Sequence, residues 1–327
     1  MKVLITGICG FIGHHVAEHF LLHTDYEILG LDRLSYAANG YDRLRDSKRF
    51  DDKRITVFPA DFVQPLSCGL MKEIGDIDYI FHLGAETHVD NSIRDPQSFI
   101  QANVVGTGRL LDYARLLPNL KKFFYFSTDE VFGPAPAGID FQEGDRQNPA
   151  NPYAASKSAA EMICLAYANT YKLPIVITRT MNCFGERQHP EKFIPLIIKK
   201  VLAGETVLIH SDPSRTKAGS RFYIHCRNVA AALLFLIDSS QVREAYHIVG
   251  EREVDNLDMA RFIAGVLQKP LKFEMVDFHS SRPGHDLRYA LDGSKMAKMG
   301  WELPKTFEQS LEKTIKWYLD NPKWLEW

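Results

Sequence analysis

Residues 2–13 of the chain read KVLITGICGFIG, an apolar run followed by the glycines Gly7, Gly10 and Gly13. The apolar run is typical of a buried parallel strand, and the amphipathic run Val16–Leu22 that follows favours a helix. In a strand–turn–helix of this kind the first glycine permits the turn, the second lets the backbone approach a pyrophosphate, and the third allows close helix–strand packing. The first amides of the helix would then face the phosphates. The stretch therefore predicts a dinucleotide cradle.

A carboxylate ends the next predicted strand. Glu27–Leu31 is apolar and leads into Asp32, about 20 residues beyond the glycines, as the dinucleotide motif requires. A carboxylate there accepts hydrogen bonds from the ribose hydroxyls and repels a 2′-phosphate. Arg33 argues the other way, since an arginine can hold that phosphate. On balance we predict NAD rather than NADP as the cofactor.

Strand and helix patterns alternate through the first half of the chain without a hairpin signal. Further strands are expected at Ile55–Pro59, Asp78–Leu83, Phe123–Phe126 and Pro174–Thr180, and a long amphipathic helix at Pro96–Leu117. Such alternation predicts an α/β fold with a doubly wound parallel sheet of the Rossmann type. A smaller mixed C-terminal substrate-binding domain is expected beside it.

The length of 327 residues suits two domains. We expect a dinucleotide-binding domain at residues 1–178, to which residues 222–250 return. Residues 179–221 and 251–327 would form the substrate-binding domain.

The bulk properties exclude several classes of partner. The net charge is −2 and the sequence has no basic run, so a surface that binds nucleic acid is not expected. No apolar run approaches the roughly 20 residues that a membrane span needs. Five scattered cysteines without a CxxC pair favour reduced thiols over disulfides or a metal site. Because the first strand begins next to Met1, no leader is expected, and the cytoplasm is the expected location.

The stretch STDEVFG, Ser127–Gly133, follows the strand Phe123–Phe126. Ligands of open parallel sheets bind beyond the carboxyl ends of the strands. Thr128, Asp129 and Glu130 would stand at such an edge, where paired carboxyls suggest acid–base chemistry. Taken alone, Asp129 and Glu130 could equally be solvated loop acids.

Tyr153 and Lys157 lie four residues apart in YAASK, at the start of a helical pattern. One turn places both side chains on the same helix face. An adjacent ammonium favours the phenolate, so we expect Lys157 to lower the pKa of Tyr153 and make it a base. An ordinary surface Tyr/Lys pair is the simpler alternative without the glycine cradle.

Other polar positions suit the same pocket. Asp61 could bond an adenine amino group, and small Gly84 and Ala85 would let the backbone lie against a cofactor. Thr87 and His88 would face whatever lies beyond, whereas His82 is expected to be a packed core histidine.

Three polar segments receive looser predictions. The charge-rich Asp42–Arg54 is expected to be a solvated helix or loop. Pro134–Pro152 is an irregular excursion that could form a lid. The loop HSDPSRTKAGSR, His210–Arg221, carries four basic residues that could clamp a diphosphate or simply be solvated.

Taken together, the motifs resemble those of the nucleotide-sugar 4,6-dehydratases within the extended short-chain dehydrogenase/reductase superfamily. The similarity spans nearly the whole length: GxxGxxG, HLGAETHVDNSI, STDEVFG, NPYAASKSAAE, PEKFIP and RPGHDLRYALD. The Thr-Asp-Glu triplet is the discriminating feature, since epimerases and decarboxylases of the superfamily usually carry other residues there.

The resemblance implies a set of site residues. Those expected at the cofactor are Gly7, Gly10, Phe11, Ile12, Gly13, Asp32, Arg33, Leu34, Ser35, Asp61, Phe62, Leu83, Gly84, Ala85, Thr87, Tyr153 and Lys157. Those expected at the substrate are Thr87, Asn182, Lys192, Arg221, Arg282 and His285. The catalytic residues would be Thr128, Asp129, Glu130, Tyr153 and Lys157.

The implied reaction converts dTDP- or UDP-glucose to the 4-keto-6-deoxyhexose through transient NADH. Tyr153, helped by Thr128, would take the proton from the hydroxyl on carbon 4. Glu130 would then remove the proton on carbon 5, while Asp129 protonates the departing hydroxyl on carbon 6. The resemblance also implies a homodimer joined through the helices at Gln97–Leu117 and Tyr153–Tyr171.

Several positions depart from the family pattern near the nucleotide. Asn182–Glu186 replaces an Asn-Asn-Tyr-Gly-Pro loop, His210–Arg221 is longer than the usual turn, Arg252 stands in place of an asparagine, and Asn91 in place of an arginine. The base therefore stays open between dTDP, UDP and another nucleotide.

Two other interpretations of the chain stay open. The same scaffold could serve a UDP-sugar 4-epimerase or decarboxylase. It could also be an NAD-binding sensor without catalysis, although a sensor needs none of Asp129, Glu130, Tyr153 and Lys157.

Overall fold

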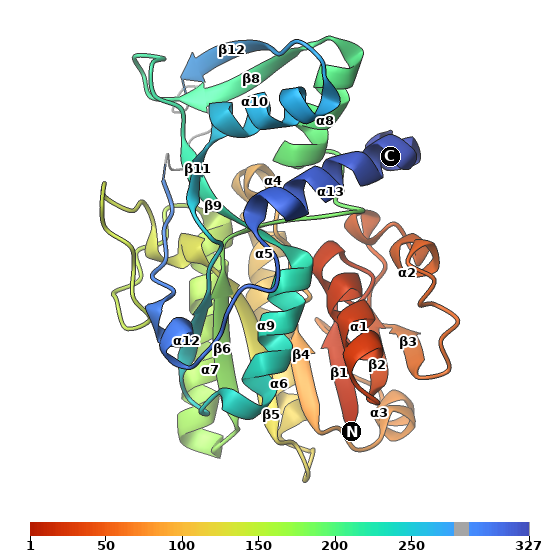
Figure 1. Ribbon diagram of the computed structural model, residues 1–327. Helices are drawn as coiled ribbons and strands as arrows, with labels where there is room; N and C mark the ends of the chain where they lie inside the picture. Colours follow the sequence, from red (N-terminus) through yellow and green to blue (C-terminus); the bar gives the residue numbers. More distant parts are fainter. Residues whose placement is uncertain (278–287, 327) are drawn as a thin grey trace.

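A seven-stranded parallel sheet forms the lower part of the molecule in Figure 1, the computed structural model of the protein, which describes residues 1–277 and 288–326. The strand order is β10-β6-β5-β4-β1-β2-β3, and every neighbouring pair is parallel. The strands are β1 Lys2–Thr6, β2 Glu27–Asp32, β3 Ile55–Pro59, β4 Tyr79–His82, β5 Lys122–Thr128, β6 Ile175–Thr180 and β10 Ala245–Ile248. The predicted doubly wound sheet is thereby confirmed.

Helices cover both faces of this sheet. On one face α1 (Phe11–His23) packs against α9 (Cys226–Ser239), and their apolar residues join those of β1 in a common core that includes Val3, Phe20 and Leu233. The other face is covered by α3 (Cys68–Ile74), α6 (Gly106–Ala114) and α7 (Pro152–Tyr171). Apolar strands buried on both faces explain the continuous hydrophobic runs in the sequence.

A smaller lobe lies above the carboxyl ends of the strands (Figure 1). It contains a parallel pair, β8 (Thr206–Ser211) with β12 (Lys272–Asp277), and a core under α8 (Phe193–Ala203), α10 (Asn256–Leu267) and α13 (Phe307–Asp320). A three-stranded sheet of β7 (Asn182–Phe184), β9 (Ser220–His225) and β11 (Glu253–Asp255) connects the lobes. The chain returns to the large sheet through α9 and β10, and the short α12 (Ser294–Lys298) and η4 (Pro322–Leu325) follow later.

The long helix expected at Pro96–Leu117 is interrupted. The chain forms α4 (Val89–Arg94), α5 (Pro96–Phe99), a π-helical segment η2 (Ile100–Val105) and then α6. In the π-helical segment Asn103 is buried, and its side chain bonds both backbone groups of Glu86 and the hydroxyl of Ser156. These tertiary hydrogen bonds, which no helical periodicity reveals, accompany the wider turn.

The prediction that Asp42–Arg54 is solvated is wrong for Arg43, which is 1% exposed. This arginine lies in α2 (Asp42–Asp46), after the turn η1 (Tyr36–Ala38). Its guanidinium donates to the carbonyls of Cys9, Ala37, Ala38 and Arg187, and burial lowers its pKa to about 10. Arg43 therefore ties the glycine loop to the small lobe.

The segment Pro134–Pro152 does not act as a lid here. Arg288 donates to the carbonyls of Pro136 and Ile139 and to the carboxylate of Asp140, and Phe141 pairs with Leu291. Within residues 1–277 and 288–326, none of this segment lines the main cavity. Strand-like pairing to residues near 290 holds it at the side of the large sheet.

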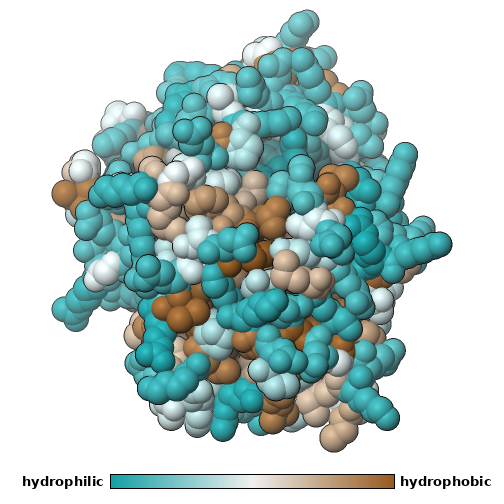
Figure 2. All heavy atoms as spheres, turned by 60° about the horizontal axis from the view of Figure 1, so that its bottom comes forward, coloured by the Kyte–Doolittle hydropathy of each residue, from teal (hydrophilic) through white to brown (hydrophobic). Residues whose placement is uncertain are grey.

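One face of the molecule is largely polar. Figure 2 shows a face on which hydrophilic side chains cover most of the area, with hydrophobic ones between them. In the part of the chain that the structure describes, no helix combines the length and apolarity of a bilayer-crossing segment.

A buried ion pair anchors α7 to the sheet, which gives a first prediction. Glu161 of α7 is fully buried and lies 2.7 Å from Arg179 of β6, and Gln147 donates a further hydrogen bond to it. Removing one partner of a buried pair leaves the other charge without compensation. Glu161→Ala should therefore cost about 3–5 kcal/mol of unfolding free energy in guanidinium titrations. Glu161→Gln, which keeps hydrogen-bonding capacity, should lose less, and equal stability of all three proteins would contradict this role.

Candidate active site

A large cavity of about 670 Å³ lies between the carboxyl edge of the large sheet and the small lobe. Its walls come from the glycine loop, the ends of β2, β4 and β5, the start of α7, and the segment from β7 into α8. Ligands of open α/β sheets bind at this edge. The lining of the cavity includes Asp32 of the large lobe and Asn256 of the small lobe.

The glycine loop leaves no room for side chains. A Cβ on Gly13 would lie 2.0 Å from the carbonyl oxygen of Gly7, and one on Gly7 would lie 2.8 Å from the Cα of Gly84. Gly7 also has a φ of +69°, which favours glycine. Helix α1 begins directly after Gly10, so its first amides stand at the cavity. These features fit the pyrophosphate of a dinucleotide.

Asp32 ends β2 and lines the cavity. Its two carboxylate oxygens accept hydrogen bonds from the backbone amides of Cys9 (2.9 Å) and Leu34 (2.8 Å), while burial raises its pKa. Arg33 forms an ion pair with Glu86 across the cavity. Because Glu86 engages the guanidinium, the arrangement fits NAD better than a 2′-phosphorylated cofactor.

Most residues expected at the cofactor line the cavity, and two do not. The lining residues are Gly7, Gly10, Phe11, Ile12, Gly13, Asp32, Arg33, Ser35, Phe62, Leu83, Gly84, Ala85, Thr87, Tyr153 and Lys157. Leu34 and Asp61 are absent from the lining, and the Asp61 carboxylate accepts a hydrogen bond from the backbone amide of Val63. His82, as predicted, is a core residue bonded to Thr6 and Thr107.

The carboxyl of Asp129 is withdrawn from water. The side chain is 5% exposed at the start of η3 (Asp129–Phe132), and the Thr128 hydroxyl donates to its Oδ1 at 3.0 Å. Its Oδ2 has no hydrogen-bond partner among the residues that the structure describes. Burial, followed by the adjacent charge of Glu130, raises the pKa of Asp129 to about 7. Asp129 can therefore hold a proton near neutral pH.

Glu130 stands in a different environment. It lines the same cavity, and its Oε2 accepts a hydrogen bond of 3.0 Å from the side-chain amide of Asn151. A donated hydrogen bond favours the ionised form of a carboxyl. The alternative interpretation of Asp129 and Glu130 as solvated loop acids does not apply to Asp129, which is buried.

Tyr153 and Lys157 both line the cavity from α7, but they do not act on each other as expected. Burial, and then the charge of Glu130, raises the pKa of Tyr153, so the predicted lowering by Lys157 is wrong for the unliganded chain. The Lys157 Nζ instead donates to the carbonyl of Phe126 at 2.6 Å. Burial lowers the pKa of Lys157 to about 8.

The expected substrate residues fall into two groups. Thr87, Asn182, Lys192 and Arg221 line the cavity, and Arg221 also stacks over the ring of Tyr289. Arg282 and His285 lie outside the described residues. In the basic loop only His210 and Arg221 line the cavity, whereas Arg215 and Lys217 are exposed. Asp212 accepts backbone hydrogen bonds from Thr216 and Lys217 and folds that loop outward.

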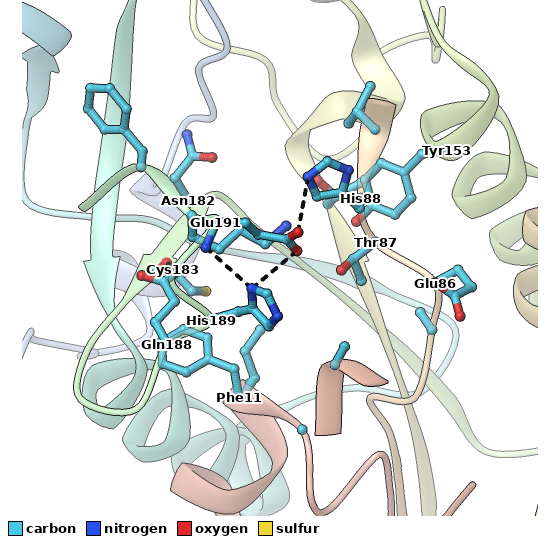
Figure 3. A pocket seen from close by; sticks show the side chains of 18 of the residues that line it. Phe11, Glu86, Thr87, His88, Tyr153, Asn182, Cys183, Gln188, His189 and Glu191 are labelled. Carbon is cyan, nitrogen blue, oxygen red and sulfur yellow. Dashed lines mark hydrogen bonds and ion pairs between the residues drawn. The ribbon is translucent and has the colours of Figure 1, made fainter. Parts of the chain in front are cut away.

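The sequence did not single out Glu191 and His189, which lie opposite His88 in Figure 3. The Glu191 carboxylate is 3.8 Å from His88 Nε2 and 3.6 Å from His189 Nδ1. His88 begins α4 in the large lobe, and His189 and Glu191 precede α8 in the small lobe. Glu191 is part of PEKFIP and His189 directly precedes it, which could have suggested them, but only the fold brings them to His88.

Two positions that depart from the family pattern lie away from the cavity lining. Arg252 pairs with Glu308 and stacks over Phe307, while Asn91 donates to the hydroxyl of Tyr36. The small-lobe wall of the cavity is lined instead by residues such as Leu208, His210 and Asn256.

Fold and site together define a dinucleotide-dependent enzyme of the extended Rossmann type. The model of the GDP-mannose 4,6 dehydratase family matches residues 4–314, and the chain belongs to this family. The family resemblance inferred from the sequence is therefore confirmed.

Relatives from different organisms are consistent with this family assignment. A trifunctional UDP-glucose 4,6-dehydratase/UDP-4-keto-6-deoxy-D-glucose 3,5-epimerase/UDP-4-keto-L-rhamnose-reductase of Arabidopsis thaliana is 35% identical over 99% of this chain, which spans about half (48%) of that protein. A dTDP-glucose 4,6-dehydratase of Escherichia coli is 34% identical over 100% of this chain and 95% of its own length. The crystal structure of the Streptomyces venezuelae dTDP-glucose 4,6-dehydratase with NAD and TYD bound has a TM-score of 0.90 at 33% identity, covering 100% of this chain and 99% of that one.

Because the pKa of Asp129 is raised, we predict that Asp129→Asn increases the stability of the folded protein, and that the increase depends on pH. A folded carboxyl with a pKa near 7, against its ordinary 3.8, binds a proton more tightly than in the unfolded chain. Its contribution to stability is complete at low pH and is lost as pH rises toward 7. The asparagine variant should be about 2–4 kcal/mol more stable than the wild type near pH 8 and about equal near pH 4. Thermal unfolding measures this, and a pH-independent difference would contradict it.

Proposed function

We propose that the protein is an NDP-hexose 4,6-dehydratase that converts a nucleotide-diphosphate glucose to the 4-keto-6-deoxy sugar. One observation carries the proposal: Asp129 and Glu130 are adjacent carboxyls at one cavity wall, but their environments differ. Environments that separate the protonation of two carboxyls assign one as acid and the other as base. Elimination of water needs both at once.

Each residue has a role in this proposal. Bound NAD would supply a positive charge and a reversible acceptor for the hydride of carbon 4, and that hydride would return to carbon 6 after the elimination, while carbon 5 regains a proton. Tyr153 takes the proton of the hydroxyl on carbon 4, with Thr128 oriented toward the same wall. Lys157 is held by the Phe126 carbonyl, so its ammonium stands in a fixed position in the cavity wall.

The elimination falls to the two carboxyls. A ketone on carbon 4 makes the proton on carbon 5 acidic, and the ionised Glu130 removes it. Asp129 gives its proton to the hydroxyl on carbon 6, which leaves as water. The low exposure of Asp129 keeps that proton in place until it is needed.

The alternatives are less well supported. A 4-epimerase or decarboxylase has no step that uses a buried acid beside an ionised base, and the raised pKa of Asp129 would be a cost without a function. A sensor without catalysis would have no use for this pair either.

The same geometry supports a partition of the chain into two functional parts. We propose that residues 1–178 with 222–250 hold the cofactor, and that residues 179–221 and 251–327 hold the nucleotide of the substrate. Thr87, Asn182, Lys192 and Arg221 would contact the sugar diphosphate. The lining at Leu208, His210 and Asn256 is compatible with dTDP or UDP.

A homodimer in the cytoplasm completes the proposal. Large hydrophobic side chains remain exposed on and beside the helices expected at the dimer contact, namely Ile100, Val105, Leu116, Met162 and Tyr171. An apolar face of this kind supports contact with a second copy.

The proposed function can be tested directly. The protein is incubated with NAD and either dTDP-glucose or UDP-glucose in deuterated water, and the products are examined by NMR and mass spectrometry. A 4-keto-6-deoxy product with solvent deuterium at carbon 5 is expected from one or both sugars. A carbon-4 epimer, or no reaction with either sugar, would contradict the proposal.

Tyr153→Phe should lower kcat by about a thousandfold or more, because the base is lost while the ring stays packed. NAD binding, followed by calorimetry, should change little. Tyr171→Phe, at an exposed position on the same helix, is the matched control and should keep full activity. Activity of Tyr153→Phe close to the wild type would show that another group takes the proton.

A further inference from the structure

Asn151 stands just behind the cavity wall and joins two parts of the site. Its side chain is 5% exposed and does not belong to the cavity lining among the described residues. Its Oδ1 accepts the amide of Ala154 at 2.9 Å and caps α7. Its Nδ2 donates to Glu130 Oε2 at 3.0 Å. One amide thus contacts both the catalytic helix and a catalytic carboxyl.

This double contact has a geometric consequence. Helix α7, which begins beside Asn151, carries Tyr153 and Lys157. Glu130 belongs to the turn after β5, a separate element of the chain. Because Asn151 bonds both, it fixes the Glu130 carboxylate relative to the start of the helix and hence to Tyr153.

We propose that Asn151 is a positioning residue that holds Glu130 as the ionised base of the elimination. The proposal rests on the dehydratase function argued above. A hydrogen bond donated to a carboxylate stabilises its charged form and fixes the orientation of its oxygens. Asp129 Oδ2, without a partner among residues 1–277 and 288–326, receives no such support. The difference in protonation between Asp129 and Glu130 therefore depends partly on Asn151, a residue outside the pair.

The surroundings of Glu130 make its ionisation sensitive to Asn151. Titratable and charged side chains from several elements line the same cavity as Glu130, among them Asp129 on the same turn, Tyr153 and Lys157 on α7, Cys183 on β7 and Arg221 on β9. A negative charge on Asp129 or on Tyr153 would oppose a negative charge on Glu130. Loss of the Asn151 donor should therefore favour protonation of Glu130.

Substitutions at this position can separate capping from positioning. Serine is a good N-cap, so Asn151→Ser keeps an acceptor for Ala154 but removes the amide donor to Glu130. Aspartate is also a good N-cap, but Asn151→Asp places a like charge against Glu130. A purely structural role predicts that both variants behave like the wild type.

In the test, kcat and KM are measured against pH with the sugar that the wild type converts. Asn151→Ser should lower kcat by about tenfold or more, since hydrogen bonds to charged groups contribute more than neutral ones, and leave KM within about twofold. The acidic limb of the kcat profile should move up by about one pH unit, and further in Asn151→Asp. Solvent deuterium should enter carbon 5 more slowly in both.

A matched control isolates the cap. Thr306 caps α13 and is not among the described residues that line the cavity, and Thr306→Ala should reduce thermal stability but leave kcat and the pH profile unchanged. If Asn151→Ser does not fold, Asn151→Asp carries the same test. Unchanged kcat and pH profile in the folded variants would overturn the role of Asn151. Absence of the 4-keto-6-deoxy product from the wild type would instead refute the proposed function itself.

Discussion

The structure depends on one electrostatic constraint. The neighbouring carboxyls of Asp129 and Glu130 stand at the end of a buried strand, where ionising both at once has a high free-energy cost. Burial of Asp129 and the charge of Glu130 act in the same direction on the pKa of Asp129. The two groups therefore divide the roles of acid and base, and a protonated carboxylic acid persists at a pH at which an exposed aspartate has lost its proton. Acid–base elimination at neutral pH follows from this division rather than from unusual residue types.

The rest of the site preserves that constraint by fixing α7 against β5 and β6. Lys157 is bonded to the last part of β5, Glu161 to Arg179 of β6, and Asn151 to the turn that carries Glu130. These three contacts involve the N-cap and the first three turns of one helix, so the positions of Tyr153 and the carboxyls are set together. Gly13, which packs α1 onto the glycine loop, and Arg43, which bonds that loop to the small lobe, serve the other end of the cavity in the same way.

Much of this arrangement could be predicted because local chemistry dictates it. Gly7, Gly10 and Gly13 are required wherever backbone approaches backbone, Asp32 ends an apolar strand, and Thr128–Glu130 follows another, so their meeting at one sheet edge follows from parallel topology. Partners distant in the sequence could not be predicted. In the sequence Arg43 has the pattern of a surface charge, but it donates a hydrogen bond to the carbonyl of Arg187, which is 144 residues away in the chain. Asn151 reads as a turn residue, and the elevated pKa of Tyr153 depends on burial and on Glu130 rather than on its neighbour Lys157.

The central claim is that Asp129 is protonated while Glu130 is ionised in the same cavity. Infrared difference spectroscopy of the NAD-bound protein, titrated across neutral pH, measures a buried carboxylic acid directly. The account predicts a protonated-carboxyl band that disappears as the pH rises through about 7, that is absent in Asp129→Asn, and that remains in Glu130→Gln. A spectrum in which both carboxyls are already ionised near pH 6, or a band that survives in Asp129→Asn, would contradict it.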